Sequence, residues 1–138
     1  MSIVTLTTDF GMKAHFVVAV KGALLSEIPE VKIVDISHNI SPFSVIEAAY
    51  IIQNAFNSFP KGSIHIIGVD SELHTENTHI AMALNGHYFI CAHNGLLSMV
   101  CTEMKPDRIV ALNLHDKILG SFTVFDVLFK DAAHIARV

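Results

Sequence analysis

The segment IVTLTTDFG, residues 3–11, decides the fold of this chain. Residues 3–7 are apolar or β-branched and run almost directly into Asp9, which a phenylalanine and a glycine follow. A short apolar run that ends in a turn signal is typical of a strand buried on both faces. The segment therefore predicts a buried strand that ends in an acidic turn.

Helix and strand patterns alternate along the rest of the chain. We expect helices over residues 15–28, 45–56, 93–99 and 126–137, and strands over residues 31–36, 64–69, 80–84, 88–91 and 108–112. The first helix is apolar on nearly every face and is expected to be heavily buried. Ser44 and Glu47 form a capping box, and Asn85-Gly86 predicts a tight hairpin turn. The alternation predicts a three-layer α/β/α sandwich, with a mostly parallel sheet and one antiparallel hairpin.

The composition limits the class of protein. Of 138 residues, 51% are hydrophobic and 16% are charged, which excludes a disordered chain. The mean hydropathy of +0.49 is high, and we expect an apolar interface to account for it. No apolar run is long enough for a membrane helix and no signal peptide is recognisable, so we expect a cytoplasmic protein that does not contact a membrane. The net charge of −4, with no basic stripe, excludes nucleic acid as a partner.

Polar side chains follow the predicted strands at their carboxyl ends, where ligands bind in open α/β sheets. The candidates are Asp9, Ser37, His38, Asp70, His74, His93 and Asn94. Each could instead cap a turn, but acid and amide groups at successive strand ends favour a binding site. The other histidines are expected to form local hydrogen bonds, and the two cysteines to be buried. The scattered glycines form no standard phosphate-binding loop, so general motifs do not identify the function.

Short motifs in a fixed order resemble one family. They are TTDFG at 7–11, KG at 21–22, IVDISH at 33–38, ISP at 40–42, FPKG at 59–62, IHIIGVD at 64–70, NGLL at 94–97 and AAHIA at 132–136. Together they cover essentially the whole chain and resemble the S-adenosylmethionine (SAM) hydroxide adenosyltransferase family, which is related to SAM-dependent chlorinase and fluorinase. Halogenation is less expected than hydrolysis, because the inserted segment of fluorinases is absent.

The resemblance implies a reaction and an assembly. Water or hydroxide attacks the ribose C5′ of SAM and leaves adenosine and methionine, with SAM as the substrate and no cofactor. Residues 1–138 would form the N-terminal domain, and the smaller C-terminal β-barrel domain of the family is absent from this chain. Family members form homotrimers in which SAM lies between the first domain of one subunit and the second domain of its neighbour.

The resemblance also implies roles for individual residues. Asp9 would hold the ribose, and Asp70 would orient the water as the acid of the family's Asp–Arg–His set. This chain departs from that set, because Asn77 stands in place of the arginine and Thr123 in place of the histidine. A sub-branch of the family could use His74 or His93 in place of the lost base, with Asn77 orienting the water. The predicted catalytic residues are Asp70, Asn77 and His74, and the predicted substrate-binding residues are Asp9, Phe10, His93 and Asn94.

Two alternatives stay open at this point. The first is a catalytically degenerate domain that only binds SAM or adenosine, since asparagine lacks the charge of arginine and threonine is no base near neutral pH. The second is a metal-dependent hydrolase in which Asp70, His74 and His93 gather a zinc ion.

Overall fold

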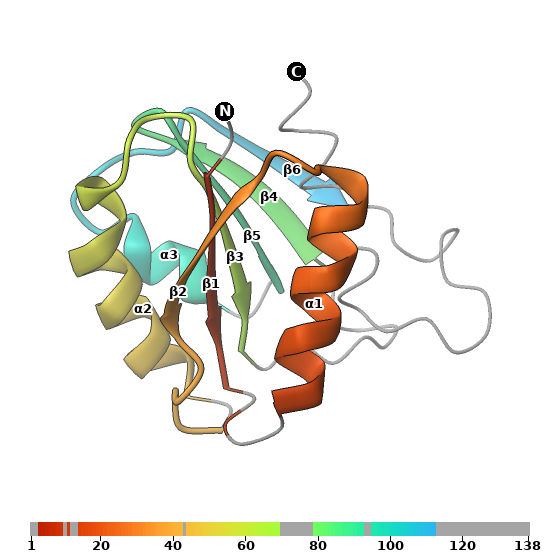
Figure 1. The fold of residues 1–138 in the computed structure, drawn as a ribbon. Helices are drawn as coiled ribbons and strands as arrows, with labels where there is room; N and C mark the ends of the chain where they lie inside the picture. Colours follow the sequence, from red (N-terminus) through yellow and green to blue (C-terminus); the bar gives the residue numbers. More distant parts are fainter. Residues whose placement is uncertain are drawn as a thin grey trace.

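The computed structural model describes residues 3–9, 11, 14–42, 44–69, 79–92 and 95–112. In chain order the elements are β1 (Ile3–Thr8), α1 (Ala14–Glu27), β2 (Lys32–Ser37), α2 (Val45–Ala55), the 3-10 turn η1 (Phe56–Ser58), β3 (Ile64–Gly68), β4 (His79–Leu84), β5 (His87–Ala92), α3 (Leu96–Val100) and β6 (Arg108–Leu112) (Figure 1). These bounds confirm the predicted strands and the first three predicted helices. The helix predicted over residues 126–137 lies outside the described residues.

The described strands form a single mixed sheet in the order β2-β1-β3-β5-β4-β6. The first four strands of that order run parallel, whereas β4 runs antiparallel to both of its neighbours. The sheet is therefore mostly parallel with an antiparallel hairpin, as the sequence predicts. Because β2, β1, β3 and β5 point the same way, their carboxyl ends lie at one edge of the sheet.

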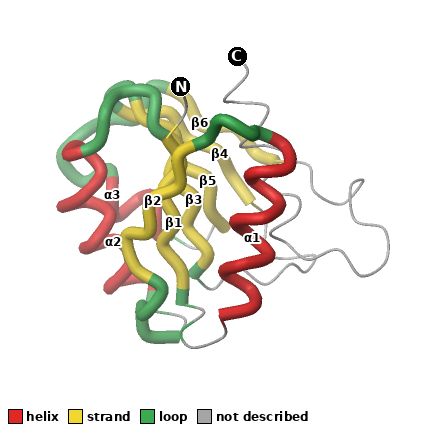
Figure 2. Tube along the Cα trace, viewed as in Figure 1, coloured by secondary structure: helices red, strands yellow, loops and turns green. Residues whose placement is uncertain are grey.

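Helices cover both faces of the sheet, which confirms the three-layer arrangement. Helix α1 lies on one face, and α2 and α3 lie together on the other (Figures 1 and 2). Alternate residues of β1 supply the two cores: Val4 and Leu6 pack with α1, while Thr5 and Thr7 point to the α2 face and are fully buried. Strand β1 is thus buried on both sides, as its continuous apolar run predicts.

The prediction that α1 is buried on nearly every face is wrong. Val20 and Leu24 are buried against the sheet, but Val18 is 66% exposed and Leu25 is 47% exposed. A helix that lies on one face of a sheet contacts it along a single stripe, so the apolar residues on its outer side stay in solvent. None of the helices within the described residues is long and apolar enough to cross a membrane.

Two local signals in the sequence have clear structural outcomes. Asn85 and Gly86 both adopt positive φ, at 50° and 81°, as a tight hairpin between twisted strands requires. The Ser44 hydroxyl accepts a hydrogen bond from the Glu47 amide, as a capping box predicts. The Glu47 carboxylate, however, accepts from the Ser41 amide, because the Ser44 amide already donates to the Ser41 carbonyl. The Glu47 carboxylate therefore binds an amide three residues before Ser44, whereas in a reciprocal capping box it would bind the Ser44 amide itself.

Both cysteines are free thiols, with Cys91 buried and Cys101 half-buried. Burial raises the pKa of the Cys91 thiol to about 12, so the thiol stays protonated and packs as a small apolar side chain. The Cys101 thiol donates to the Met82 sulfur over 3.3 Å. The expectation that these residues are core residues is confirmed for Cys91 and only in part for Cys101.

Candidate functional site

Asp9 stands at the point where three parallel strands end. It follows the last residue of β1, and its amide donates to the carbonyl of Gly68, the last residue of β3, over 3.3 Å. On the other side, the segment after β2 contacts the same turn through the Gly11 amide, which donates to the His38 carbonyl over 2.7 Å. The acidic residue that the sequence places at the exit of β1 is therefore held between the exits of β2 and β3.

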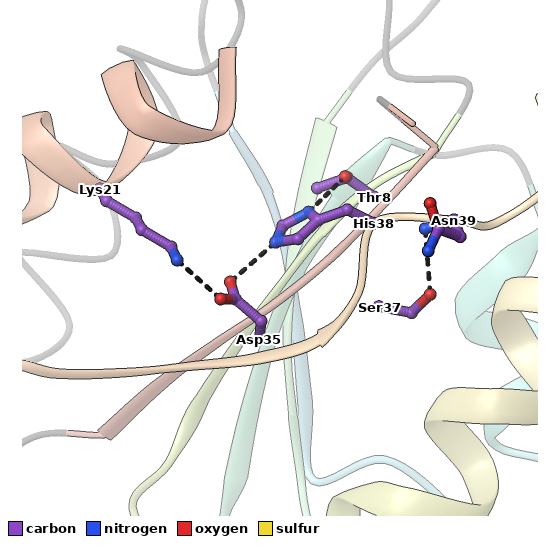
Figure 3. A network of polar contacts seen from close by, with 6 residues as sticks. All are labelled: Thr8, Lys21, Asp35, Ser37, His38 and Asn39. Carbon is purple, nitrogen blue, oxygen red and sulfur yellow. Dashed lines mark hydrogen bonds and ion pairs between the residues drawn. The ribbon is translucent and has the colours of Figure 1, made fainter. Parts of the chain in front are cut away.

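A chain of four polar side chains lies directly beside Asp9. The Thr8 hydroxyl lies 2.7 Å from Nδ1 of His38, and Nε2 of His38 lies 2.7 Å from Oδ1 of Asp35 (Figure 3). The Lys21 ammonium, from α1, donates to the second oxygen of Asp35 over 2.6 Å. We call Thr8, Lys21, Asp35 and His38 the strand-exit network. It connects helix α1 to the ends of both β1 and β2.

The charges of the network determine the tautomer of His38. Partial burial by itself raises the pKa of Asp35, but the hydrogen bonds and charges of Lys21 and His38 outweigh it and hold that pKa below 3.8. Asp35 is therefore ionised at neutral pH and can only accept, so Nε2 of His38 carries the proton. In the neutral ring Nδ1 is then an acceptor, and the Thr8 hydroxyl donates to it.

The strand-exit network is graded in exposure. The side chains of Asp35 and Lys21 are 39% and 35% exposed, that of His38 is 17% exposed, and Thr8 is 3% exposed. The ion pair at the solvent end is worth little by itself because water screens it. The inner hydrogen bond between His38 and Thr8 is screened less and restrains the β1 exit more strongly.

Thr7 adds an unusual polar atom to the same strand exit. Its hydroxyl is fully buried on the α2 face and has no hydrogen-bond partner within the described part of the chain. A buried hydroxyl without a partner costs about 1–3 kcal/mol, and such atoms are rare in folded proteins. The end of β1 thus carries a buried hydroxyl next to Thr8 and Asp9 that the described residues leave without a hydrogen-bond partner.

A second polar cluster lies in the core, on the α2 face. Nδ1 of His65 lies 2.7 Å from the Thr5 hydroxyl, and Nε2 of His65 lies 3.1 Å from Nδ1 of His87. The ring of Phe56 packs edge-on against both histidine rings, and that of Phe89 lies 5.0 Å from His65. We call Thr5, His65 and His87 the core cluster. The local hydrogen bonding expected for these two histidines is confirmed.

Burial keeps the core histidines neutral. It is the main reason that the pKa of His65 is lowered to about 3, with a further contribution from the charge of His87. The pKa of His87 is also lowered, first by burial and then by the charge of Lys61. Neither ring is accessible to a ligand from solvent, since His65 is fully buried and His87 is 2% exposed. This cluster is therefore structural.

Most of the predicted site residues lie outside the described residues. Of the seven, only Asp9 is described; Phe10, Asp70, His74, Asn77, His93 and Asn94 are not. The same holds for the three proposed zinc ligands, and no group of three metal-binding side chains gathers among the residues that are described. Ser37 and His38, named from their place after β2, do lie at the carboxyl edge beside Asp9, and the Ser37 hydroxyl accepts from the Asn39 amide over 3.1 Å.

Sequence reasoning missed the partners of His38. Lys21 and Asp35 lie within the KG and IVDISH motifs, but residues 14 positions apart give no signal of contact. The available signal is the spacing of Asp35 and His38, which lets the two side chains meet around the end of a strand. The fold and these contacts together define an open, mostly parallel α/β domain with polar side chains gathered at the exits of β1, β2 and β3, the edge at which ligands bind in such sheets.

Comparison with known proteins identifies the family. The sequence pattern of the SAM hydroxide adenosyltransferase N-terminal domain matches residues 4–138. An (R)-S-adenosyl-L-methionine hydrolase of Methanocaldococcus jannaschii is 34% identical over 82% of this chain and 44% of its own length. A protein of that name from Salinispora arenicola is 27% identical over 96% of this chain and 52% of its own length. The chain belongs to the SAM hydroxide adenosyltransferase family and covers its N-terminal domain.

Solved structures agree with this assignment. A conserved protein of Thermotoga maritima superposes with a TM-score of 0.85 at 28% identity, over 99% of this chain and 55% of the other. A conserved protein of Thermus thermophilus gives a TM-score of 0.80 at the same identity, over 99% of this chain and 54% of the other. The chain thus spans about half the length of the curated relatives and solved structures that it matches.

Proposed function

We propose that the protein hydrolyses SAM to adenosine and methionine, as part of an assembly that supplies the second half of the site. The observation that carries the proposal is the placement of Asp9, which is held by hydrogen bonds between the exits of three parallel strands. The names of the relatives supply the substrate, because four that match are (R)-S-adenosyl-L-methionine hydrolases. SAM is the substrate, and no cofactor takes part.

The reaction suits a water-poor crevice at the edge of a sheet. Hydroxide and the sulfonium cation of SAM lose their opposite charges as they react, so removing bulk water lowers the barrier. Placing the oxygen in line behind the carbon–sulfur bond supplies much of the remaining acceleration. The Asp9 carboxylate accepts hydrogen bonds from the ribose hydroxyls, and the Asp70 carboxylate orients the attacking water. His74 and Asn77 stand in for the histidine and arginine of the family, Phe10 borders the adenine, and His93 and Asn94 complete the substrate pocket.

The proposed assembly is a cytoplasmic homotrimer in which neighbouring copies share each site. Support comes from the exposed apolar side chains Val18 and Leu25 on α1, which a partner surface would cover, and from the free thiols of Cys91 and Cys101, which suit a reducing compartment. Light scattering during size-exclusion chromatography measures the assembly directly, and a monomer at all concentrations would contradict it.

The activity is tested by incubating the protein with SAM and measuring adenosine and methionine by chromatography. We expect equal amounts of both products. Asp70→Asn should lower the rate by about 100-fold or more, because it removes the group that orients the water. Asp9→Asn should instead weaken adenosine binding by about tenfold, because it removes a charged acceptor for the ribose hydroxyls.

Asp107→Asn is the matched control, since this exposed carboxylate lies beside Ala83 at the opposite end of the sheet and should leave both quantities unchanged. Binding of SAM without release of adenosine would overturn hydrolysis and support the degenerate binding domain. An unchanged rate in Asp70→Asn would overturn the proposed mechanism while leaving the substrate in place.

A further inference from the structure

The backbone on both sides of Asp9 is fixed by residues 38–40, the segment that follows β2. The Ile40 amide donates to the Thr8 carbonyl over 3.4 Å, and the Gly11 amide donates to the His38 carbonyl over 2.7 Å. Between these two backbone contacts, the His38 ring bonds the Thr8 hydroxyl over 2.7 Å. Two of these contacts reach Thr8, the residue directly before Asp9, and the side-chain hydrogen bond with His38 is the shorter of the two.

His38 is itself held in place from the outer side. Its Nε2 is bonded to Asp35, which in turn bonds Lys21 of α1 (Figure 3). An imidazole with partners at both nitrogens has one rotamer and one tautomer available. The position of helix α1 is thereby transmitted through two side chains to the end of β1.

We propose that His38 is a positioning residue, which holds the Thr8–Asp9 turn so that the Asp9 carboxylate faces the two ribose hydroxyls of its nucleoside ligand. The inference rests on the proposed function, since it takes a nucleoside as the ligand of Asp9. A diol that bridges a carboxylate needs both oxygens in place, and a displacement of about 1 Å loses one of the two hydrogen bonds. His38 therefore acts on the ribose through Thr8 and Asp9 and does not touch the ligand.

Two substitutions separate the two nitrogens of the ring. In His38→Gln the longer amide reaches the position of Nε2, so it keeps the bond to Asp35 and loses the bond to Thr8. In His38→Asn the shorter amide occupies the position of Nδ1, so it keeps the bond to Thr8 and loses the bond to Asp35. The backbone contacts of residues 38–40 persist in both variants. The proposal requires that only the first variant disturbs Asp9.

The measurement is binding of adenosine and of 2′,3′-dideoxyadenosine, followed by calorimetry or by NMR titration. The ratio of the two dissociation constants reports the recognition of the diol alone. We expect His38→Gln to lower this ratio by about tenfold, through weaker binding of adenosine with unchanged binding of the dideoxynucleoside. His38→Asn should keep the ratio within about twofold of the wild type.

Thr8→Val provides an independent variant, since it removes the hydroxyl from the Thr8 side and should reproduce the effect of His38→Gln if that variant does not fold. Equal weakening of adenosine and dideoxyadenosine binding in His38→Gln or in Thr8→Val would overturn the role of His38. The same ratio of dissociation constants in His38→Asn and His38→Gln would overturn it as well. If the wild type itself shows no preference for adenosine over the dideoxynucleoside, the proposed function fails as well, so the two failures are distinguishable.

Discussion

Two regions of this domain contain the same hydrogen bond in opposite environments. In the strand-exit network, Thr8 of β1 bonds Nδ1 of His38, and in the core cluster Thr5 of the same strand bonds Nδ1 of His65; both distances are 2.7 Å. The two threonines lie three residues apart and point to opposite faces of the sheet. The second partner of each histidine differs, being the carboxylate of Asp35 for His38 and the ring of His87 for His65.

The environment decides what the shared bond can do. The core cluster is sealed by Phe56 and Phe89, so its histidines stay neutral and serve packing. The strand-exit network reaches solvent through the charged side chains of Lys21 and Asp35, beside the turn at Asp9. A threonine–histidine pair that is sealed from solvent thus contributes to core packing. The pair that is partly exposed to solvent can instead position the neighbouring residue Asp9.

The largest expected effect that separates the two regions is the response to acid. The unfolded chain binds a proton at His65 near pH 6.5, whereas the folded chain does so only near pH 3. Between these values the unfolded state holds more protons, so the free energy of unfolding falls as the pH is lowered. The slope is at most about 1.4 kcal/mol per pH unit, or roughly 4 kcal/mol across the window.

Urea unfolding at several pH values between 7 and 3 measures this slope. The carboxyl groups of Asp35 and Glu47 overlap with this effect only at the acid end, because their lowered pKa values cost stability as the pH falls through their ordinary values of 3.8 and 4.5. His65→Gln keeps hydrogen-bonding groups but cannot titrate, so it should remove most of the slope above pH 4 and leave only the smaller part that comes from His87, whose pKa burial also lowers. A slope as steep as that of the wild type would show that His65 is not the main group that opposes protonation.

The next largest effect is the loss of the buried ring. His65→Ala leaves a cavity beside Phe89 and removes the partner of Thr5, and we expect the free energy of unfolding to fall by about 3 kcal/mol. The matched change His38→Ala should cost only about 1 kcal/mol, because that ring is partly solvated and water replaces its bonds. Denaturant titration of both variants tests the contrast, and equal losses would erase the distinction between core and site.

The smallest expected effect lies at the solvent end of the strand-exit network. Lys21→Met removes one member of an ion pair in which both side chains are more than one-third exposed. Such pairs contribute about 0.5 kcal/mol or less, so the denaturation midpoint should hardly move. A loss of 2 kcal/mol or more in the same titration would mean that the network stabilises the fold as strongly as the core cluster does.

The local signals in the sequence predicted the elements well because each depends on a few neighbouring residues. Asn85-Gly86 predicted the hairpin through backbone freedom, and the apolar run of β1 predicted burial on both faces. The capping box was right for the Ser44 hydroxyl and wrong for the Glu47 carboxylate, whose choice of Ser41 depends on the turn before the helix. The burial of α1 was overestimated because the hydropathy of a helix does not say how many neighbours it will have.

The candidate site was predictable in its location and not in its contacts. The place of Asp9 and His38 after strands put both at one edge, since parallel strands end together. Nothing local indicated that Thr8 faces His38 or that Lys21 reaches Asp35, because these pairs meet only through strand register and helix docking. The roles assigned to Asp70, His74 and Asn77 stay predictions, as these residues lie outside the described part of the chain.

The sequence by itself determined the alternation of strands and helices, the acidic end of the first strand and the family, because periodicity and motif order are properties of the linear chain. The tertiary structure alone decided which of two similar threonine–histidine pairs is dry and which is wet. Neighbouring side chains of one strand point to opposite faces, and what covers each face is set by helices that lie far away in the sequence.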